Sequence, residues 1–260
     1  MLSFVHGFNL FIFVALTIMY CYQMIYVLVG LFGDRKKNDR SALAVRKQHK
    51  FAVVIAARNE RAVIGELIRS IKNQNYPAEL LDTIVVADNC TDDTAQVARD
   101  AGAIVYERFN KEQVGKGYAL DYLFKHIYAD YPDAGYEGYF VFDADNLLDE
   151  NYVAEMNKIF DGGYRIITSY RNSKNYGSNW ISAGYALWFL REARFLNNSR
   201  MQLNSSCAVS GTGFLISDEI VRANNGWKHH LLTEDIEFSI DSVIHGEKIG
   251  YCEKAKIYDE

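Results

Sequence analysis

The sequence predicts an α/β fold in which a mostly parallel central sheet is flanked by helices and preceded by one N-terminal transmembrane helix. Within residues 51–145, apolar runs typical of buried strands alternate with segments whose apolar residues repeat at helical spacing. One of these runs, Tyr139–Phe142, stops abruptly at two carboxylates, Asp143 and Asp145. A long uncharged stretch, Phe8–Phe32, precedes the whole alternating region.

The uncharged stretch predicts a membrane anchor. It covers 25 positions, and at about 1.5 Å of rise per residue such a helix crosses a hydrocarbon core of about 30 Å. Asp34–Lys50 then carries seven basic and two acidic residues, so the positive-inside rule places the N-terminus outside and the rest of the chain in the cytoplasm. A cleaved signal peptide is disfavoured because no basic start or small-residue cleavage site is evident, whereas a buried core helix stays open. We therefore expect an anchor at 1–34, a basic juxtamembrane linker at 35–50 and a globular domain at 51–260.

Composition excludes some classes of partner. The chain has 260 residues, 49% of them hydrophobic, and a formal charge of −5, which argues against a nucleic-acid binder because phosphate backbones require clustered Lys and Arg. The four cysteines show no Cys-x-x-Cys pair, so we expect free thiols in a reducing compartment.

The first half of the globular domain reads as strand, helix, strand, helix, strand. The expected strands are Phe51–Ala57, Thr83–Ala87 and Ala103–Tyr106, with right-handed crossover helices between them. Ligands of such sheets bind at the carboxyl ends of the strands, where Ala57, Asn59, Glu60 and Asp88 stand. The absence of Gly-x-Gly-x-x-Gly disfavours a dinucleotide cofactor, and the absence of a Walker motif weakens an NTPase interpretation.

A further helix is expected to begin near Gly115-Lys116-Gly117. Backbone amides at a helix start attract anions, so Lys116 would reach a phosphate or nucleotide; the alternative is a plain loop with a solvated lysine.

The Asp143-Ala144-Asp145 motif has three interpretations. A calcium EF-hand loop fails because Leu147 and Leu148 occupy the positions that need an oxygen donor and a glycine. A solvated turn is possible because Asp favours turns. The third is a site for a phosphate-bearing ligand, which requires a hard divalent cation to bridge carboxylate and phosphate oxygens.

The second half carries fewer signals. Tyr164–Tyr170 reads as a strand, and Ser178–Asn198 reads as one helix whose many aromatic residues are expected to be mostly core, although stacking on sugars is an alternative. His229 and His230 are expected in a mobile loop, solvated or completing a metal shell.

A last helix is expected to begin at Glu234 and Asp235. Thr233 would cap it, and Asp235 would face the cleft, where the helix dipole favours an ionised carboxylate. Simple dipole complementarity is the alternative role of the two acidic residues. The opposite face of this helix is expected to be buried through four apolar residues, Ile236, Ile240, Val243 and Ile244.

Six segments together resemble the family 2 glycosyltransferases, which have the Rossmann-like GT-A fold and include relatives of the cellulose, chitin and hyaluronan synthases. The resemblance spans about 210 residues. The segments, in the family's order, are Val53–Glu60, Val85–Asp92, Gly115–Asp121 with Asp143–Asp145, Ser210–Phe214 and Thr233–Asp235.

The resemblance implies a role for each position. Asn59, Glu60 and Asp88 would line the nucleotide with Ala57 and Lys116 nearby, and Asp143 and Asp145 would hold the diphosphate through Mg²⁺ or Mn²⁺. Gly211 and Gly213 would shape the turn beside the substrate. Asp235 would be the general base of an inverting transfer, with Glu234 beside it in the acceptor site. The chemistry of sugar transfer requires the same two roles. A metal ion would neutralise the charge of the leaving diphosphate, and a base would take the proton of the acceptor hydroxyl.

The sequence therefore predicts a membrane-anchored glycosyltransferase that moves a sugar from a nucleotide sugar, most simply a UDP-sugar, to a polysaccharide or a lipid-linked acceptor. The donor sugar would be a hexose or an N-acetylhexosamine, and the oligomeric state is not readable. The Gln-x-x-Arg-Trp motif of processive members does not occur before Glu260, so we expect either a compact non-processive enzyme or a fragment of a longer one. The alternatives are a catalytically incompetent nucleotide-sugar-binding module and, less favoured, a nucleotidyltransferase, whose basic glycine-rich loop is missing after Ala57.

Overall fold

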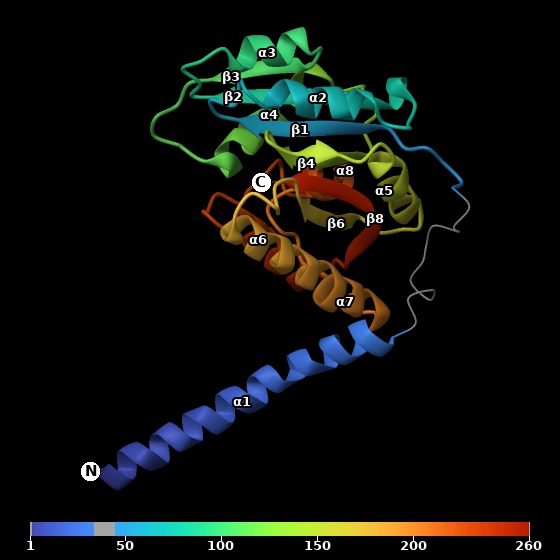
Figure 1. Ribbon diagram of the computed structural model, residues 1–260. Coiled ribbons are helices and arrows are strands. Elements are labelled where there is room, and N and C mark those ends of the chain that lie inside the picture. Colours follow the sequence, from blue (N-terminus) through green and yellow to red (C-terminus); the bar gives the residue numbers. More distant parts are fainter. Residues whose placement is uncertain (1, 34–44, 260) are drawn as a thin grey trace.

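The computed structural model describes residues 2–33 and 45–259 and builds the globular part around one mixed sheet (Figure 1). Its strand order is β3-β2-β1-β4-β7-β6-β8-β5. The strands are β1 Phe51–Ala57, β2 Leu81–Asp88, β3 Ile104–Arg108, β4 Gly138–Asp143, β5 Leu147–Leu148, β6 Ile166–Ser173, β7 Phe214–Ser217 and β8 Ile249–Asp259.

Helices connect most of these strands. They are α1 Leu2–Phe32, α2 Ile64–Lys72, the 3-10 turn η3 Ala78–Leu80, α3 Thr94–Asp100, α4 Lys116–Asp130, α5 Tyr152–Asp161, α6 Trp180–Arg191, the π-helical segment η4 Glu192–Asn197, α7 Asn198–Gln202, α8 Asp218–Ala223 and α9 Glu234–Ile244.

The parallel half of the sheet confirms the expected crossovers. β1 pairs in parallel with β2 on one side and with β4 on the other, and β2 pairs in parallel with β3. The chain therefore leaves β1 in one direction through α2 and later returns to the other side of β1 through α4. The crevice between the carboxyl ends of β1 and β4 is the switch point at which open α/β sheets bind ligands.

Alternate residues of β1 fill two cores, one on each face of the sheet. Ala52 and Val54 pack with Leu120 and Phe124 of α4, whereas Val53 and Ile55 pack with α2 on the opposite face. Every residue of β1 except Ala56 is buried, as a strand covered on both faces requires. This double burial fixes where β1 and β4 end and therefore where the crevice lies.

Beyond β4 the sheet becomes mixed. β7 pairs antiparallel with β4 and β6, and β6 pairs in parallel with β8, a strand that the sequence did not reveal. Gly213 begins this region with φ +68, and a Cβ there would lie 2.4 Å from Ile257 of β8. Glycine is thus required by both backbone conformation and space at this position.

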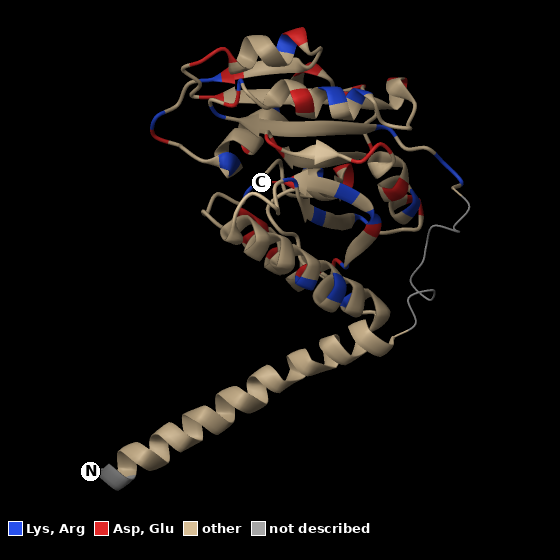
Figure 2. Ribbon diagram, viewed as in Figure 1, with Lys and Arg blue, Asp and Glu red and all other residues tan. Residues whose placement is uncertain are grey.

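Within the described residues, one helix is long and apolar enough to cross a membrane. It covers Phe4–Phe32, and its most apolar 18-residue window has a mean hydropathy of 2.0 and is not buried in the protein. Figure 2 shows it without a charged residue. Most of the predicted basic linker, residues 35–44, lies outside the described residues, as does residue 34 of the predicted anchor.

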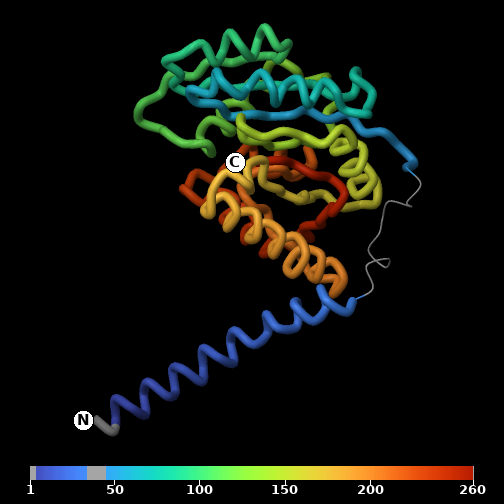
Figure 3. Tube along the Cα trace, viewed as in Figure 1, coloured from blue at the N-terminus to red at the C-terminus, as the bar shows by residue number. Residues whose placement is uncertain are grey.

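The predicted helix Ser178–Asn198 is divided, and most of its aromatic residues are not core. α6 passes into π-helical η4 and then α7 as one continuous rod (Figure 3). Trp180, Tyr185 and Trp188 are exposed, and Phe189 is the one buried residue of α6. Our expectation of core packing was wrong because apolar composition does not distinguish a protein core from another apolar environment.

The predicted buried face of α9 is also wrong. Ile236, Ile240, Val243 and Ile244 are all exposed, whereas Phe238, Ser239 and Ser242 face inward. Phe238 packs between Phe214 and Trp227, with ring centroids 5.8 and 5.0 Å away. The helical period correctly grouped the four aliphatic residues on one face of α9, but this face is exposed. The opposite face meets the core because Phe238 lies on it. Thr233 occupies the N-cap position but makes no side-chain capping bond.

Candidate active site

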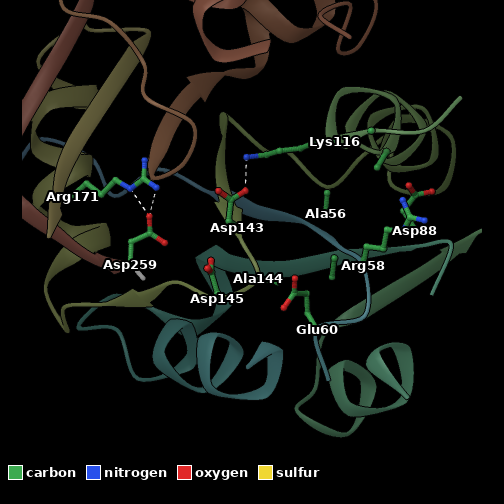
Figure 4. A pocket seen from close by; sticks show the side chains of 13 residues that line it. Ala56, Arg58, Glu60, Asp88, Lys116, Asp143, Ala144, Asp145, Arg171 and Asp259 are labelled. Atoms are coloured by element: carbon green, nitrogen blue, oxygen red, sulfur yellow. Dashed lines mark hydrogen bonds and ion pairs between the residues drawn. The ribbon is translucent and has the colours of Figure 1, made fainter. Parts of the chain in front are cut away.

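A pocket of about 390 Å³ opens at the switch point of the sheet (Figure 4). Its walls come from the end of β1, the start of α4, the end of β4, and two strands of the mixed half through Arg171 and Asp259. The lining residues are Ala56, Ala57, Arg58, Glu60, Asp88, Gly115, Lys116, Ala119, Asp143, Ala144, Asp145, Arg171 and Asp259.

One side of the pocket is strongly acidic. Burial raises the pKa of Asp145, and the negative charges of Asp259 and Asp143 raise it further. Burial likewise raises the pKa of Glu60, with added repulsion from Asp145, Asp92 and Asp143. These carboxylates repel one another when ionised, and a bound cation would reduce that repulsion.

Lys116 supplies a positive charge on the opposite side. Its ammonium lies 2.5 Å from Asp143 Oδ1 and donates to the Gly211 carbonyl at 2.8 Å. It also lies 3.8 Å from Glu234 Oε1. Lys116 is therefore neither a solvated loop lysine nor isolated, because it links β4 to the turn after α7 and to α9.

A buried polar network holds the Asp143 turn in place. The Asp143 amide donates to Thr212 Oγ1 at 2.9 Å, and Thr212 in turn donates to Asn146 Oδ1. Asn146 Nδ2 donates to Asp259 Oδ1 at 2.9 Å. Asp259 also forms an ion pair with Arg171. The network ties the end of β4 to the Gly211-Thr212-Gly213 turn and to the end of β8.

Asp88 lines the pocket, but its negative charge is paired with the positive charge of Arg108. Its Oδ1 lies 2.6 Å from Arg108 Nη1, and both side chains are almost fully buried. Asn59, at φ +59, instead accepts from the Thr91 amide at 2.8 Å and does not line the pocket. The two residues thus shape the loops around the pocket mouth from different sides.

The first turn of α9 reaches the pocket indirectly. Asp235 Oδ2 accepts from the Gly211 amide at 2.7 Å, and Lys116 contacts the carbonyl of the same glycine. Burial raises the pKa of Glu234, while Lys116 opposes that rise. Gly211, with φ +68, therefore stands between the candidate base and the basic wall of the pocket.

The structure gathers six of the predicted site residues around the pocket: Ala57, Glu60, Asp88, Lys116, Asp143 and Asp145. Gly211, Glu234 and Asp235 connect to it through hydrogen bonds or Lys116, whereas Asn59 and Gly213 stand outside its lining.

Sequence reasoning missed Arg58, Arg171 and Asp259 as pocket-lining residues. Arg58 follows β1 directly and its position was a usable signal. Arg171 and Asp259 belong to no local motif.

The two histidines before α9 do not match the expected solvated loop. His229 is buried against Trp227 and Phe238, and burial lowers its pKa. His230 stacks on Tyr118 with ring centroids 4.2 Å apart.

Across residues 2–33 and 45–259, no three His, Cys, Asp or Glu side chains gather closely enough to hold a metal by themselves. All four cysteines are free, as expected.

The buried Asp88–Arg108 pair predicts a stability effect. Replacing Arg108 by Met should lower the free energy of unfolding by about 3 kcal/mol, because it leaves Asp88 buried without its partner. The matched control is Arg99→Met, whose exposed pair with Glu107 is worth about 1 kcal/mol or less. Urea unfolding of the detergent-solubilised chain, followed by tryptophan emission, measures both. Equal losses in the two variants would contradict this role for Arg108.

Comparison with known proteins places this pocket in a family. A family model described as "Glycosyltransferase like family 2" matches residues 49–260. The chain belongs to glycosyltransferase family 2. The resemblance seen in the sequence is thereby confirmed, and the carboxylates and lysine of the pocket lie within the matched residues.

Two relatives of this family 2 chain are distant in sequence and longer than it. A probable glycosyltransferase of Sulfolobus acidocaldarius is 22% identical over 93% of this chain and 52% of its own length. The beta-monoglucosyldiacylglycerol synthase of Synechocystis is also 22% identical, over 80% of this chain and 43% of its own length. The chain therefore spans about half the length of the curated relatives it matches.

Solved structures confirm the GT-A-like fold. A mannosyltransferase from Pyrobaculum calidifontis in complex with GDP-Man and Mn²⁺ aligns with a TM-score of 0.62 at 15% identity, covering 94% of this chain and 67% of that one. TarS 1–349 of S. aureus in complex with UDP aligns with a TM-score of 0.57 at 18% identity, covering 81% and 60%.

Proposed function

We propose that this glycosyltransferase is a metal-dependent, inverting enzyme. It moves a sugar from a nucleotide sugar, most simply a UDP-sugar carrying a hexose or N-acetylhexosamine, to a polysaccharide or glycolipid at the cytoplasmic face of the membrane. The observation that carries the proposal is the pocket at the switch point, which has an acidic side formed by Asp145 and Glu60 and a basic wall formed by Lys116. A diphosphate needs both, because the acidic side binds it only through a cation.

Asp143 and Asp145 fit a divalent cation. The Asp145 side chain faces the pocket, and its raised pKa reflects the nearby charges of Asp259 and Asp143 as well as its burial. When bound, Mg²⁺ or Mn²⁺ would neutralise the charge that develops on the leaving diphosphate. Hard oxygen donors such as these suit either ion.

The protein's own residues would perform the remaining work. Lys116 holds Asp143 at 2.5 Å, and its ammonium would contact a donor phosphate at the start of α4. Ala57 and Glu60 would line the nucleotide, with Asp88 fixed behind them by Arg108. Asp235 would take the proton of the acceptor hydroxyl, and Glu234 would lie beside it. The Gly211 amide orients the Asp235 carboxylate through its hydrogen bond.

One observation favours a second candidate, a nucleotide-sugar-binding module that does not transfer. Asp235 does not line the pocket itself but reaches it through Gly211. A module would bind donor through the same carboxylates and lysine without using Asp235. Binding alone therefore does not separate the two functions, whereas transfer does.

A donor screen tests the binding that both candidates share and identifies the donor. The purified chain should gain thermal stability from one class of nucleotide sugar when Mn²⁺ is present, and lose that gain when EDTA removes the cation. A hundredfold excess of ligand over Kd corresponds to about 2.7 kcal/mol of added stability. Stabilisation that is equal with and without the cation would show that the acidic side has another purpose.

A further inference from the structure

Helix α6 is exposed although it is apolar. Arg191 is its one charged residue, and Phe189 is its one buried residue. Six large apolar side chains are exposed: Trp180, Ile181, Tyr185, Leu187, Trp188 and Leu190. A helix that is apolar on all sides is stable in a protein core or in a membrane, and α6 lies in neither within the isolated chain.

The same helix is continuous with the part of the protein that contacts the candidate membrane anchor. α6 runs through η4 into α7, and η4 and α7 pack against the last turns of α1 (Figure 1, Figure 3). Ser199 Oγ donates to the Tyr26 carbonyl at 2.7 Å. Phe195 packs closely against Gly30, because a Cβ added to Gly30 would lie 2.7 Å from the Phe195 ring. The C-terminal end of α1 is therefore connected by direct packing to the helical rod that contains the exposed apolar helix α6.

We propose that α6 is embedded in the bilayer surface and that the lipid bilayer is the occupant of its exposed apolar face. Trp180, Tyr185 and Trp188 are the aromatic residues favoured where a helix meets the headgroup region. Arg191, at the end of the helix nearest to α1, has its guanidinium 5.3 Å from the Trp188 ring centroid and donates to Gln23 Oε1 of α1 at 3.4 Å, so its charge lies beside a polar side chain of the candidate anchor. The inference rests on the proposed role of α1 as an anchor.

The inward side of α6 and η4 belongs to the active site. The Arg171 guanidinium lies 4.6 Å from the Phe189 ring centroid, and Arg171 lines the donor pocket. Glu192, the first residue of η4, accepts from Ser210 at 3.4 Å, next to the glycine that holds Asp235. Embedding α6 therefore places this wall of the site at the membrane surface, within reach of an acceptor that resides in the same bilayer.

The tryptophans of the chain provide a direct test. The sequence contains three, Trp180, Trp188 and Trp227, and none lies in α1. Trp180 and Trp188 are exposed on α6, whereas Trp227 is 2% exposed inside the globular part. The full chain is reconstituted into phosphatidylcholine vesicles with and without brominated acyl chains, and its emission is compared.

The proposal expects brominated lipid to quench the emission of two of the three tryptophans. The Trp180→Phe/Trp188→Phe variant should lose this quenching, and the matched Trp227→Phe variant should retain it. Unchanged emission in a chain that floats with the vesicles would overturn the proposal. If acrylamide also fails to quench that emission, a second copy of the chain covers α6, which overturns it equally. A chain that does not float would remove both anchor and proposal.

None of these readings depends on sugar transfer. An inactive chain with quenched tryptophans would refute the proposed function and leave the embedded helix standing. An active chain with unquenched tryptophans would do the reverse.

Discussion

Replacing Asp235 by Asn should abolish sugar transfer and leave donor binding close to wild type. The amide keeps an oxygen that accepts the Gly211 hydrogen bond, which is 2.7 Å long in the native chain, so the turn beside the pocket stays in place. What is lost is the ability to take a proton. Loss of a positioned base typically costs about 10² to 10⁴ in rate. Initial rates of transfer, together with calorimetry of UDP and Mn²⁺, measure the two properties separately.

A matched control for this variant is Asp241→Asn, the same change six residues further along α9. Asp241 forms a partly exposed ion pair with Lys228, whose loss costs about 1 kcal/mol or less. We expect near-native transfer from this control. Transfer by Asp235→Asn at a rate like that of the control would remove Asp235 from the role of base.

The second large effect is expected from Asp145→Asn, which should remove the part of donor binding that depends on the cation. The substitution takes one of the two proposed carboxylate ligands away while preserving the size of the side chain. Affinity for UDP in the presence of Mn²⁺ should fall about 100-fold, since even indirect supports of a metal site contribute 10- to 100-fold. Asp149→Asn, four residues further on, is the control, because its carboxylate binds the Asn151 amide outside the pocket.

The same site predicts a direction for the pH dependence. Because burial and neighbouring charges raise the pKa of Asp145, a proton competes with the cation at a higher pH than at an ordinary aspartate. Cation-dependent UDP binding should therefore weaken as the pH falls through that raised pKa. In Asp145→Asn this component of the pH profile should disappear. A profile that is unchanged by the substitution would assign the titration to another group.

The parallel half of the fold was readable from sequence because its signals are local. β1 was predicted with its observed bounds, since a continuous run of β-branched and apolar residues is typical of a strand that is covered on both faces. Asp143 and Asp145 were located because β4 ends where its apolar run ends. Strand ends of a parallel sheet meet at one edge, which brings Glu60 and Asp88 to the same pocket.

The mixed half was not readable, because its contributions depend on pairing between distant strands. Arg171 and Asp259 reach the pocket only because β6 and β8 lie side by side in parallel, and no short motif encodes that pairing. Asn146 bridges Thr212 and Asp259 inside the network for the same reason. In α9 the helical period was recognised, but the inward face was chosen by Phe238, whose partners Phe214 and Trp227 are distant in sequence.

The helix α6 shows a different limit. Its composition was read as core, although Trp180 and Trp188 are exposed, because sequence patterns report how apolar a surface is and not what covers it. The division of the chain into anchor, linker and catalytic domain stays a prediction that the vesicle experiments address.

The most direct test of the central claim is transfer of labelled sugar by the purified chain reconstituted with lipid, measured with Mn²⁺ and after its removal by EDTA. The pocket geometry predicts that label passes from the nucleotide sugar to an acceptor only when the cation is present. Donor that binds with Mn²⁺ but yields neither transfer nor hydrolysis would contradict the claim and identify the chain as a binding module.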